Sequence, residues 1–229
     1  VAAPGFLNFY AKNEYFRVKI GQYDGDLGVI FGDNISWGEY SDKMIVTEFS
    51  DPNPFKVLHV GHLYTSVVGD AISRMLELAG ARVARVNFGG DVGLHVAKTL
   101  YAVKRKALEA GEEGMGRLIK ELTIEDIARC YVEGTRAYDE DEAAHEKIAE
   151  LNKEVYRIAE LGRSESEALG GEEGELARLY WRGRELSYEY FDEFYERIGV
   201  RFDRYYPEST VAGRGLKEVR EHVGTVYEE

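Results

Sequence analysis

Two strand-like runs alternate with two helical patterns in the first half of this sequence, and this alternation restricts the fold more than any other feature. The runs Lys43–Phe49 (KMIVTEF) and Arg82–Phe88 (RVARVNF) are short and contain β-branched residues, which indicates strands. Each run is followed by apolar residues at helical spacing, in His62–Ala79 and in Leu94–Leu108. This order predicts a parallel sheet with right-handed crossovers, and therefore an α/β, Rossmann-like fold.

The helix predicted over His62–Ala79 has a wide apolar face. Its apolar residues form two rows at helical spacing: Leu63, Val67, Ala71, Met75 and Leu78, and Tyr64, Val68, Ile72 and Leu76. A face of this width is typical of a helix that a hydrophobic core covers. We therefore expect this face to be buried, and the first strand to be buried as well.

The second half of the chain is predicted to be largely helical and then to return to the sheet. Two long amphipathic helices are predicted over 139–161 and 174–200, with a polar loop near 162–174 between them. Residues 115–199 are thus mostly helical, and VRFDRYYPES (Val200–Ser209) is predicted to be a return strand. The last residues, VGTVYEE, are predicted to begin another strand.

Charge and cysteine content restrict the class of protein. The formal net charge of −13 argues against a general polyanion binder, because neutralising phosphates requires Lys and Arg. A local basic patch or a further domain could still contact a nucleic acid.

No run approaches the roughly 18 apolar residues of a membrane span, so we expect no membrane partner. The single cysteine, Cys130, cannot form an internal disulfide, and we expect a small packed residue in a cytoplasmic protein.

The loop between the first strand and the first helix contains two histidines in the frame H-V-G-H. Ligands bind parallel sheets beyond the carboxyl ends of the strands, where this loop and the glycine loop 88–93 both lie. Gly61 allows a ligand to approach the backbone, and His62 lies at a helix start, which favours an anion. Imidazoles there can donate hydrogen bonds to phosphate oxygens, so His59 and His62 predict a triphosphate site. The alternatives are a capped helix with incidental histidines, or a metal site completed by His95.

The segment TEFSDPNPFKVLHVGH resembles the HIGH element of class I aminoacyl-tRNA synthetases, and in particular that of arginyl-tRNA synthetases. The matching residues are Glu48, Phe49, Ser50, Pro52, Asn53, Lys56, His59, Gly61, His62, Leu63, Gly69 and Asp70. The family's next element, a strand followed by G-D-x-G, is matched by RVNFGGDVGLH, and PGFLNF resembles the end of the domain that precedes its catalytic core. The resemblance implies a remnant of an N-terminal tRNA-binding domain or linker over 1–41. It implies a partial Rossmann-type catalytic domain over 42–229.

The resemblance also implies an activity, the ligation of arginine to tRNA in two steps. ATP would activate L-arginine to arginyl-adenylate, with Mg²⁺ helping the pyrophosphate to leave, and the arginyl group would then pass to tRNA(Arg). We expect a monomer with no metal held by protein side chains. We also expect the catalytic domain to be truncated at both ends, so that this chain carries the HIGH half only and is inactive alone.

The implied ATP site lies in the HIGH region. His59, His62 and Lys56 are the expected catalytic residues. The two histidines and Gly61 would contact the phosphates, and Lys56 would add positive charge near the leaving pyrophosphate. The whole HIGH region comprises Pro52, Asn53, Pro54, Phe55, Lys56, Val57, Leu58, His59, Val60, Gly61 and His62.

The implied arginine site uses residues at the ends of the two strands. Glu48 would pair with the guanidinium group of arginine, since a carboxylate can bind that group bidentately. Ser50 and Asn53 would hold the amino-acid end of the substrate. Asp91 would either contact arginine or cap the following helix, and His95 is expected to be packed and not catalytic.

Three residues depart from the family pattern, and two other functions stay open. Asp51 stands where serine is more usual, Tyr64 replaces an arginine, and Val92 replaces a tryptophan. Small nucleotidylyltransferases share H-x-G-H but usually have one residue between proline and the first histidine, whereas FKVL separates Pro54 from His59. The other alternative is a non-catalytic fragment that binds ATP or tRNA.

Overall fold

The structure is a computed structural model that describes residues 12–13, 40–109, 111 and 114–227. Most of the predicted N-terminal remnant, 1–41, lies outside the described residues, so its assignment stays a prediction. The chain divides into two compact units, one made of Val1–Met44 and Arg74–Arg82, the other of Ile45–Ser73 and Val83–Glu229. All residues of the candidate site belong to the second unit.

The described residues form a three-stranded sheet in the order β1-β2-β3, from β1 (Met44–Glu48), β2 (Arg82–Gly89) and β3 (Arg204–Pro207). Strands β2 and β3 are parallel, with Val86 beside Arg204. The predicted α/β fold with a parallel sheet is confirmed. The return strand is shorter than predicted, because a helix begins directly after Pro207.

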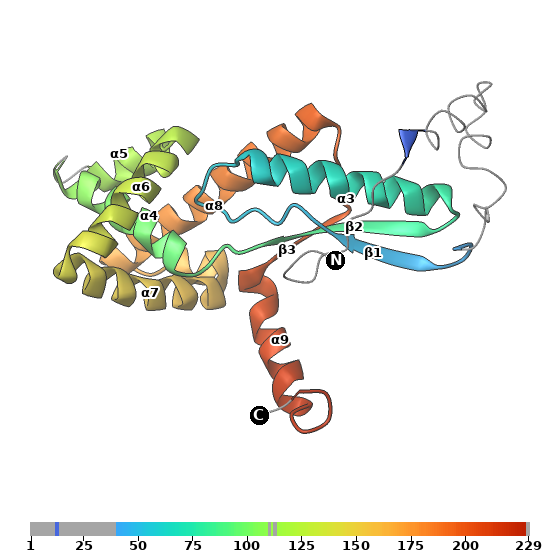
Figure 1. The fold of residues 1–229 in the computed structure, drawn as a ribbon. Helices are drawn as coiled ribbons and strands as arrows, with labels where there is room; N and C mark the ends of the chain where they lie inside the picture. The colour runs from blue at the N-terminus through green and yellow to red at the C-terminus, as the bar shows by residue number, and fades with distance from the viewer. Residues whose placement is uncertain (1–11, 14–39, 110, 112–113, 228–229) are drawn as a thin grey trace. The chain divides into compact units, whose positions relative to one another are not determined.

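The helices are α3 (Val60–Leu78), α4 (Leu94–Glu109), α5 (Gly114–Glu121), α6 (Ile124–Glu140), α7 (Glu142–Glu167), α8 (Gly171–Ile198) and α9 (Glu208–Glu221). Figure 1 shows α4 to α7 gathered beyond the carboxyl ends of β1 and β2, with α8 returning from them towards the sheet. The predicted loop near 162–174 is wrong. Helix α7 continues to Glu167 through a kink at Gly162, whose φ is 76°, and only 168–170 separate it from α8.

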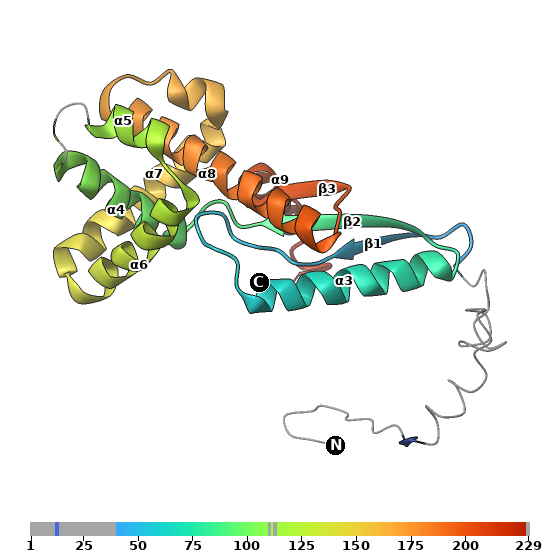
Figure 2. The ribbon, with the colours of Figure 1, turned by 90° about the horizontal axis from the view of Figure 1, so that it is seen from above.

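Helices α3 and α8 lie on the same face of the sheet. Arg85 and Asn87 are two residues apart on β2, so their side chains point to one face. The Nε of Arg85 lies 3.4 Å from a carboxylate oxygen of Asp70 on α3, and the side-chain amide of Asn87 donates to the hydroxyl of Tyr195 on α8 at 3.2 Å. Right-handed crossovers in a sheet ordered β1-β2-β3 require this arrangement, and Figure 2 shows both helices running beside the strands.

The predicted burial of the apolar face of α3 is wrong for the described residues. Small side chains meet the sheet instead. Ser66 and Ser73 are fully buried, and a Cβ added to Gly69 would lie 2.1 Å from the ring of Phe49. Because this close approach leaves no room for large residues, the apolar rows point away and expose Leu63, Tyr64, Val67, Val68, Ile72, Met75 and Leu78.

Strand β1 is also less buried than predicted. Its exposure alternates along the chain, and the side chains of Met44 and Val46 are 59% and 63% exposed. Thr47 points to the helical face, where its hydroxyl lies 2.8 Å from that of Ser73. One face of β1 is therefore covered by α3, and the other is exposed.

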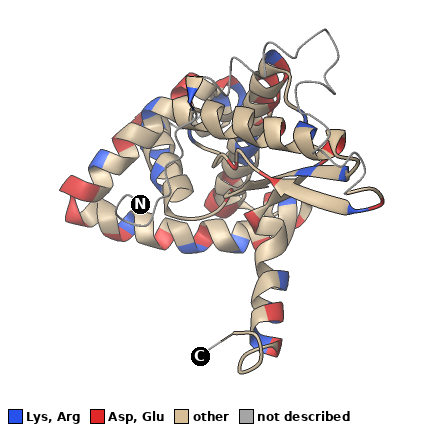
Figure 3. Cartoon of the chain, turned by 45° about the vertical axis from the view of Figure 1, so that its right-hand side comes forward, with Lys and Arg blue, Asp and Glu red and all other residues tan. Residues whose placement is uncertain are grey.

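The helical region has its own hydrophobic core. The predicted packing of Cys130 is confirmed, because it is 1% exposed within a cluster that includes Leu100, Ile127 and Ile148. Figure 3 shows acidic and basic residues interspersed along α7, and ion pairs such as Arg157 with Glu154 join exposed side chains there. No helix in the described part of the chain is long and apolar enough to span a membrane. The strand predicted for the last residues is wrong for 223–227, which form a turn closed by a bridge between Val223 and Tyr227, and 228–229 lie outside the described residues.

Candidate functional site

The loop between β1 and α3 is fixed on α8 by Phe55. This residue is 1% exposed, and its ring fills the space that a Cβ on Gly183 would need, 2.4 Å away. The backbone N–H of Phe55 donates to the Ser187 hydroxyl at 2.9 Å. Ser50, Asp51 and Phe55 all have positive φ, an uncommon conformation for residues with side chains. The path of this loop is therefore set by its contacts with α8 and not by local preference.

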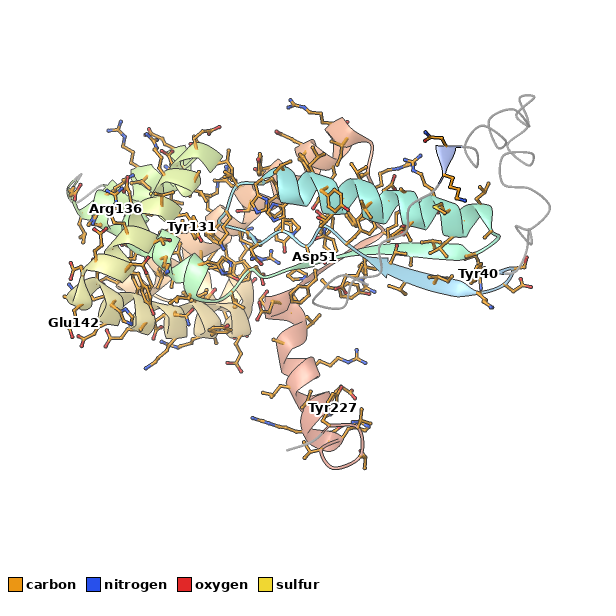
Figure 4. The ribbon with its side chains drawn as sticks, viewed as in Figure 1. Tyr40, Asp51, Tyr131, Arg136, Glu142 and Tyr227 are labelled. Atoms are coloured by element: carbon orange, nitrogen blue, oxygen red, sulfur yellow. The ribbon has the colours of Figure 1, made fainter. Side chains whose placement is uncertain are left out.

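Ser50 and Asp51 both bond within the chain. The Ser50 hydroxyl is nearly buried and lies 2.7 Å from the hydroxyl of Tyr195. An oxygen of Asp51 accepts a hydrogen bond from the backbone N–H of Phe88 on β2 at 2.8 Å, and Figure 4 shows Asp51 just beyond the end of β1. Burial and the nearby Glu48 raise the pKa of Asp51, while the Phe88 bond opposes this shift. Asp51 thus ties the start of the loop to the neighbouring strand.

The imidazole rings of His59 and His62 lie together at the start of α3, with centroids 4.0 Å apart. The backbone N–H of His59 donates to Nδ1 of His62 at 3.2 Å, and the N–H of Gly61 donates to Nδ1 of His59 at 3.1 Å. Because each Nδ1 accepts, each neutral ring carries its proton on Nε2. Both histidines therefore present an Nε2–H donor. The backbone N–H groups of Gly61 and His62 bond to His59 and are therefore not free to bind an anion.

The missing side chain of Gly61 leaves room for the His59 ring, and the surroundings of His62 favour its neutral form. A Cβ on Gly61 would lie 2.8 Å from Cε1 of His59, so a larger residue would displace the ring. Burial lowers the pKa of His62, and His59 and Lys56 lower it further. His62 is therefore neutral at physiological pH and able to donate from Nε2.

Lys56 belongs to the loop, and its side chain reaches the helical region. Its Nζ is 4.9 Å from the centroid of the Tyr131 ring on α6, and Figure 4 shows Tyr131 on the helical side of the loop. Its charge contributes to the lowered pKa values of both His62 and His95. Lys56 therefore supplies positive charge near the paired imidazoles.

Asn53 lies against the glycine loop that follows β2. A Cβ on Gly90 would lie 2.4 Å from Oδ1 of Asn53 and 3.4 Å from Oε2 of Glu208. Burial and the nearby Asp91 raise the pKa of Glu208. The absence of a side chain at Gly90 thus lets an amide and a carboxylate approach the same point at the carboxyl edge of the sheet.

Asp91 is fully buried and holds three segments together. One oxygen accepts from the backbone N–H of Ser209 at 2.8 Å, and the other accepts from the Ser209 hydroxyl and from Nε of Arg184, both at 2.6 Å. The bond to Ser209 fixes the first turn of α9, where Glu208 begins the helix. Asp91 therefore bonds within the chain with both oxygens, and its contact with arginine stays a prediction.

His95 is partly buried in the first turn of α4. Its Nε2 lies 2.9 Å from the carbonyl oxygen of Gly90, so Nε2 donates. Burial and Lys56 lower the pKa of His95 to about 4, although Gly90 and Asp91 oppose the shift. No group of three or more His, Cys, Asp or Glu side chains suited to a metal ion occurs among the described residues, so His95 does not complete a metal site with His59 and His62.

Comparison with known proteins assigns the chain to a family. A family model described as "tRNA synthetases class I (R), catalytic domain" matches residues 32–212. The chain belongs to this family. Membership of this family argues against the alternative of a small nucleotidylyltransferase, while the assignment of H-V-G-H as the HIGH element stays a prediction.

Two relatives agree with this assignment, and a solved structure shares the fold. The chain is 31% identical over 204 residues to an arginine–tRNA ligase of Azotobacter vinelandii, and 31% identical over 216 residues to that of Clostridium perfringens. It covers 30% and 34% of these relatives, which cover 88% and 94% of it. The fold resembles a crystal structure of arginyl-tRNA synthetase from Plasmodium falciparum, with a TM-score of 0.52 and 21% identity over 83% of this chain and 29% of that one.

The structure thus brings the predicted ATP residues together. The predicted arginine residues fall into two groups, according to whether their side chains already bond within the chain. The side chains of Asn53 and Glu48 form no hydrogen bond or ion pair among the described residues, whereas those of Ser50 and Asp91 bond within the chain. Sequence reasoning missed Glu208. The rule that ligands bind beyond strand ends could have found it, since Glu208 directly follows β3 and Asp91 lies two residues after the end of β2.

Proposed function

We propose that the protein is an arginine–tRNA ligase that activates L-arginine with ATP and transfers it to tRNA(Arg). Membership of the class I arginyl family and the names of its relatives support this function. The chain spans about a third of the length of the relatives that it matches, so the activity belongs to the whole protein. The observation that carries the proposal is the pair of Nε2–H donors on His59 and His62.

The paired imidazoles would bind the phosphates of ATP. As the carboxylate of arginine attacks the α-phosphorus, negative charge grows on the phosphate oxygens and on the leaving pyrophosphate. Two fixed N–H donors stabilise such charge more than they stabilise the ground state. Lys56 would add a positive charge on the same side of the loop. Mg²⁺ would arrive bound mainly to the phosphates, which is its usual mode in nucleotide sites.

The amide of Asn53 and the carboxylates of Glu48 and Glu208 would bind arginine. All three lie at the carboxyl edge of the sheet, and Asn53 and Glu208 both approach Gly90. Ser50 and Asp91 would act by holding these neighbours in place, since their polar atoms already bond within the chain. Residues 42–229 would be the HIGH half of the catalytic domain of a cytoplasmic monomer.

The test is ATP–pyrophosphate exchange by the full-length protein in the presence of L-arginine and tRNA(Arg). We expect exchange to require arginine, and we expect His62→Ala to lose at least about 2 kcal/mol of transition-state stabilisation, roughly a 30-fold lower rate. His222→Ala, an exposed histidine on the C-terminal side of α9, is the control and should exchange normally. Exchange driven by another amino acid would contradict the proposed substrate. A normal rate in His62→Ala would contradict the proposed site.

A further inference from the structure

Tyr195 on α8 lies at the end of a buried series of hydroxyl groups that leads to the carbonyl oxygen of His62. We propose that Tyr195 is a positioning residue for His62, acting through Ser50 and Ser66. This inference rests on the proposed role of His62 in binding phosphates. Tyr195 itself touches neither imidazole, and it belongs to none of the motifs found in the sequence.

The series is continuous. The Tyr195 and Ser50 hydroxyls are 2.7 Å apart, those of Ser50 and Ser66 are 2.9 Å apart, and the Ser66 hydroxyl donates to the His62 carbonyl oxygen at 2.6 Å. The amide of Asn87 donates to Tyr195 at 3.2 Å. Ser66 and Asn87 are fully buried, and Tyr195 is 3% exposed. Water therefore has little access to these bonds, and each group depends on its protein partner.

The Ser66 hydroxyl connects His62 with Ser50. It donates both to the carbonyl oxygen of His62 and to the Ser50 hydroxyl, and because a hydroxyl has one proton, the two bonds share it. In the pair of Ser50 and Tyr195 either hydroxyl can donate. Burial raises the pKa of Tyr195 to about 12, so its hydroxyl keeps its proton at neutral pH.

This series contacts His62 at its backbone carbonyl oxygen, whereas the imidazole is held at Nδ1. The ring is fixed because Nδ1 accepts from the backbone N–H of His59, and the backbone is fixed because its carbonyl accepts from Ser66. A shift of the first turn of α3 would therefore break one of the two contacts. The geometry makes the direction of the Nε2–H donor depend on Tyr195.

Helix α8 also holds the loop at a second residue, Phe55. Ser187 and Tyr195 are eight residues apart, so they lie on one face of α8. Ser187 holds the backbone N–H of Phe55, and Tyr195 holds the hydroxyl of Ser50. Helix α8 thus holds the loop from Ser50 to His62 at two residues, Ser50 and Phe55. Of the two α8 residues that make these contacts, Tyr195 is the one connected to His62 through the series.

The experiment compares Tyr195→Phe with Tyr190→Phe, a change on the same helix at a tyrosine that is only half-buried. In ATP–pyrophosphate exchange by the full-length protein, we expect Tyr195→Phe to lower kcat roughly 10-fold with KM for arginine within about twofold. Tyr190→Phe should leave both unchanged. Ser66→Ala, which removes the bond to His62 and keeps a good helix former, should reproduce the loss even if Tyr195→Phe folds poorly.

A second comparison separates positioning from general damage. In the His62→Ala background, Tyr195→Phe should lower the rate no further, because residues that act as a unit are not additive. An equal loss with and without His62, or normal kcat in Ser66→Ala, would overturn the proposal.

A measurement without turnover separates this proposal from the proposed function. By NMR titration of His62, we expect Tyr195→Phe and Ser66→Ala to raise its pKa towards the ordinary value as the ring moves from His59 and Lys56. An unchanged His62 pKa in both variants would overturn the positioning role. A protein that shows the NMR shift but no arginine-dependent exchange would refute the ligase function and leave the positioning of His62 supported.

Discussion

The carboxylate of Asp91 and the guanidinium of Arg184 lie 2.6 Å apart, although 93 residues separate them in the chain. Asp91 is fully buried and the Arg184 side chain is 21% exposed. The guanidinium also lies over the rings of Trp181 and Tyr188. This ion pair joins the loop after β2 to α8, and through Ser209 it joins both to α9.

Replacing Asp91 with Asn should destabilise the protein strongly. The substitution leaves Arg184 without its carboxylate in a mostly buried site, and breaking a buried ion pair costs about 3–5 kcal/mol. Urea unfolding would measure the loss. Glu221→Gln, which removes the partner of Lys217 in an exposed pair, is the matched control and should change stability by no more than about 0.5 kcal/mol. Equal losses in the two variants would show that the Asp91 pair is not structural.

Replacing Gly61 with Ala should reduce activity without reducing stability. Alanine favours a helix over glycine by about 1 kcal/mol, but its Cβ would lie 2.8 Å from the His59 ring and displace it. We expect slower ATP–pyrophosphate exchange and an unchanged or higher melting temperature. Gly213→Ala on α9, where a Cβ would meet nothing within 4 Å, controls for the helix effect. Normal exchange by Gly61→Ala would mean that the position of the His59 ring does not matter.

Replacing Gly90 with Ala should weaken arginine binding more than ATP binding. The new Cβ would lie 2.4 Å from Oδ1 of Asn53, so the amide must move. Steady-state exchange kinetics should show a higher KM for arginine and a KM for ATP within about twofold. Gly116→Ala on α5, which meets no neighbour, should change neither. Equal increases in both KM values would argue against an amino-acid site at Asn53.

Stability should fall as the pH drops below 6.5, partly because of His95. Its folded pKa of about 4 lies below the ordinary value of 6.5, so the unfolded chain binds more protons between these values and protonation favours unfolding. The stability from neutral His95 is full above pH 6.5 and is lost as the pH falls towards 4. We expect about 2 kcal/mol of loss between pH 7.5 and pH 5 from this residue. Urea unfolding at both pH values should show a smaller loss in His95→Gln, and an identical loss would contradict the assignment.

Some features of the site were accessible from the sequence because they depend on short-range spacing. The H-V-G-H frame places His59 and His62 one turn apart at a helix start, and Gly61 between them leaves room for the rings. Their tautomers were not accessible, because these depend on which backbone N–H each Nδ1 accepts. Glu208 and Tyr195 were also missed, since nothing local to either residue indicates that it approaches Gly90 or Ser50.

The sequence by itself determined that strands and helices alternate, that the sheet is parallel, and that the loops after β1 and β2 lie at one edge. Periodicity and turn residues are local properties, so they are readable without a partner. Only the tertiary structure decided which face of α3 meets the sheet. The helical period marks an apolar face, but the close approach at Gly69 admits only small side chains, so Ser66 and Ser73 are buried and the apolar rows are exposed. The tertiary structure likewise decided that Ser50 and Asp91 bond within the chain, because buried polar groups have little access to water and form hydrogen bonds with nearby protein groups.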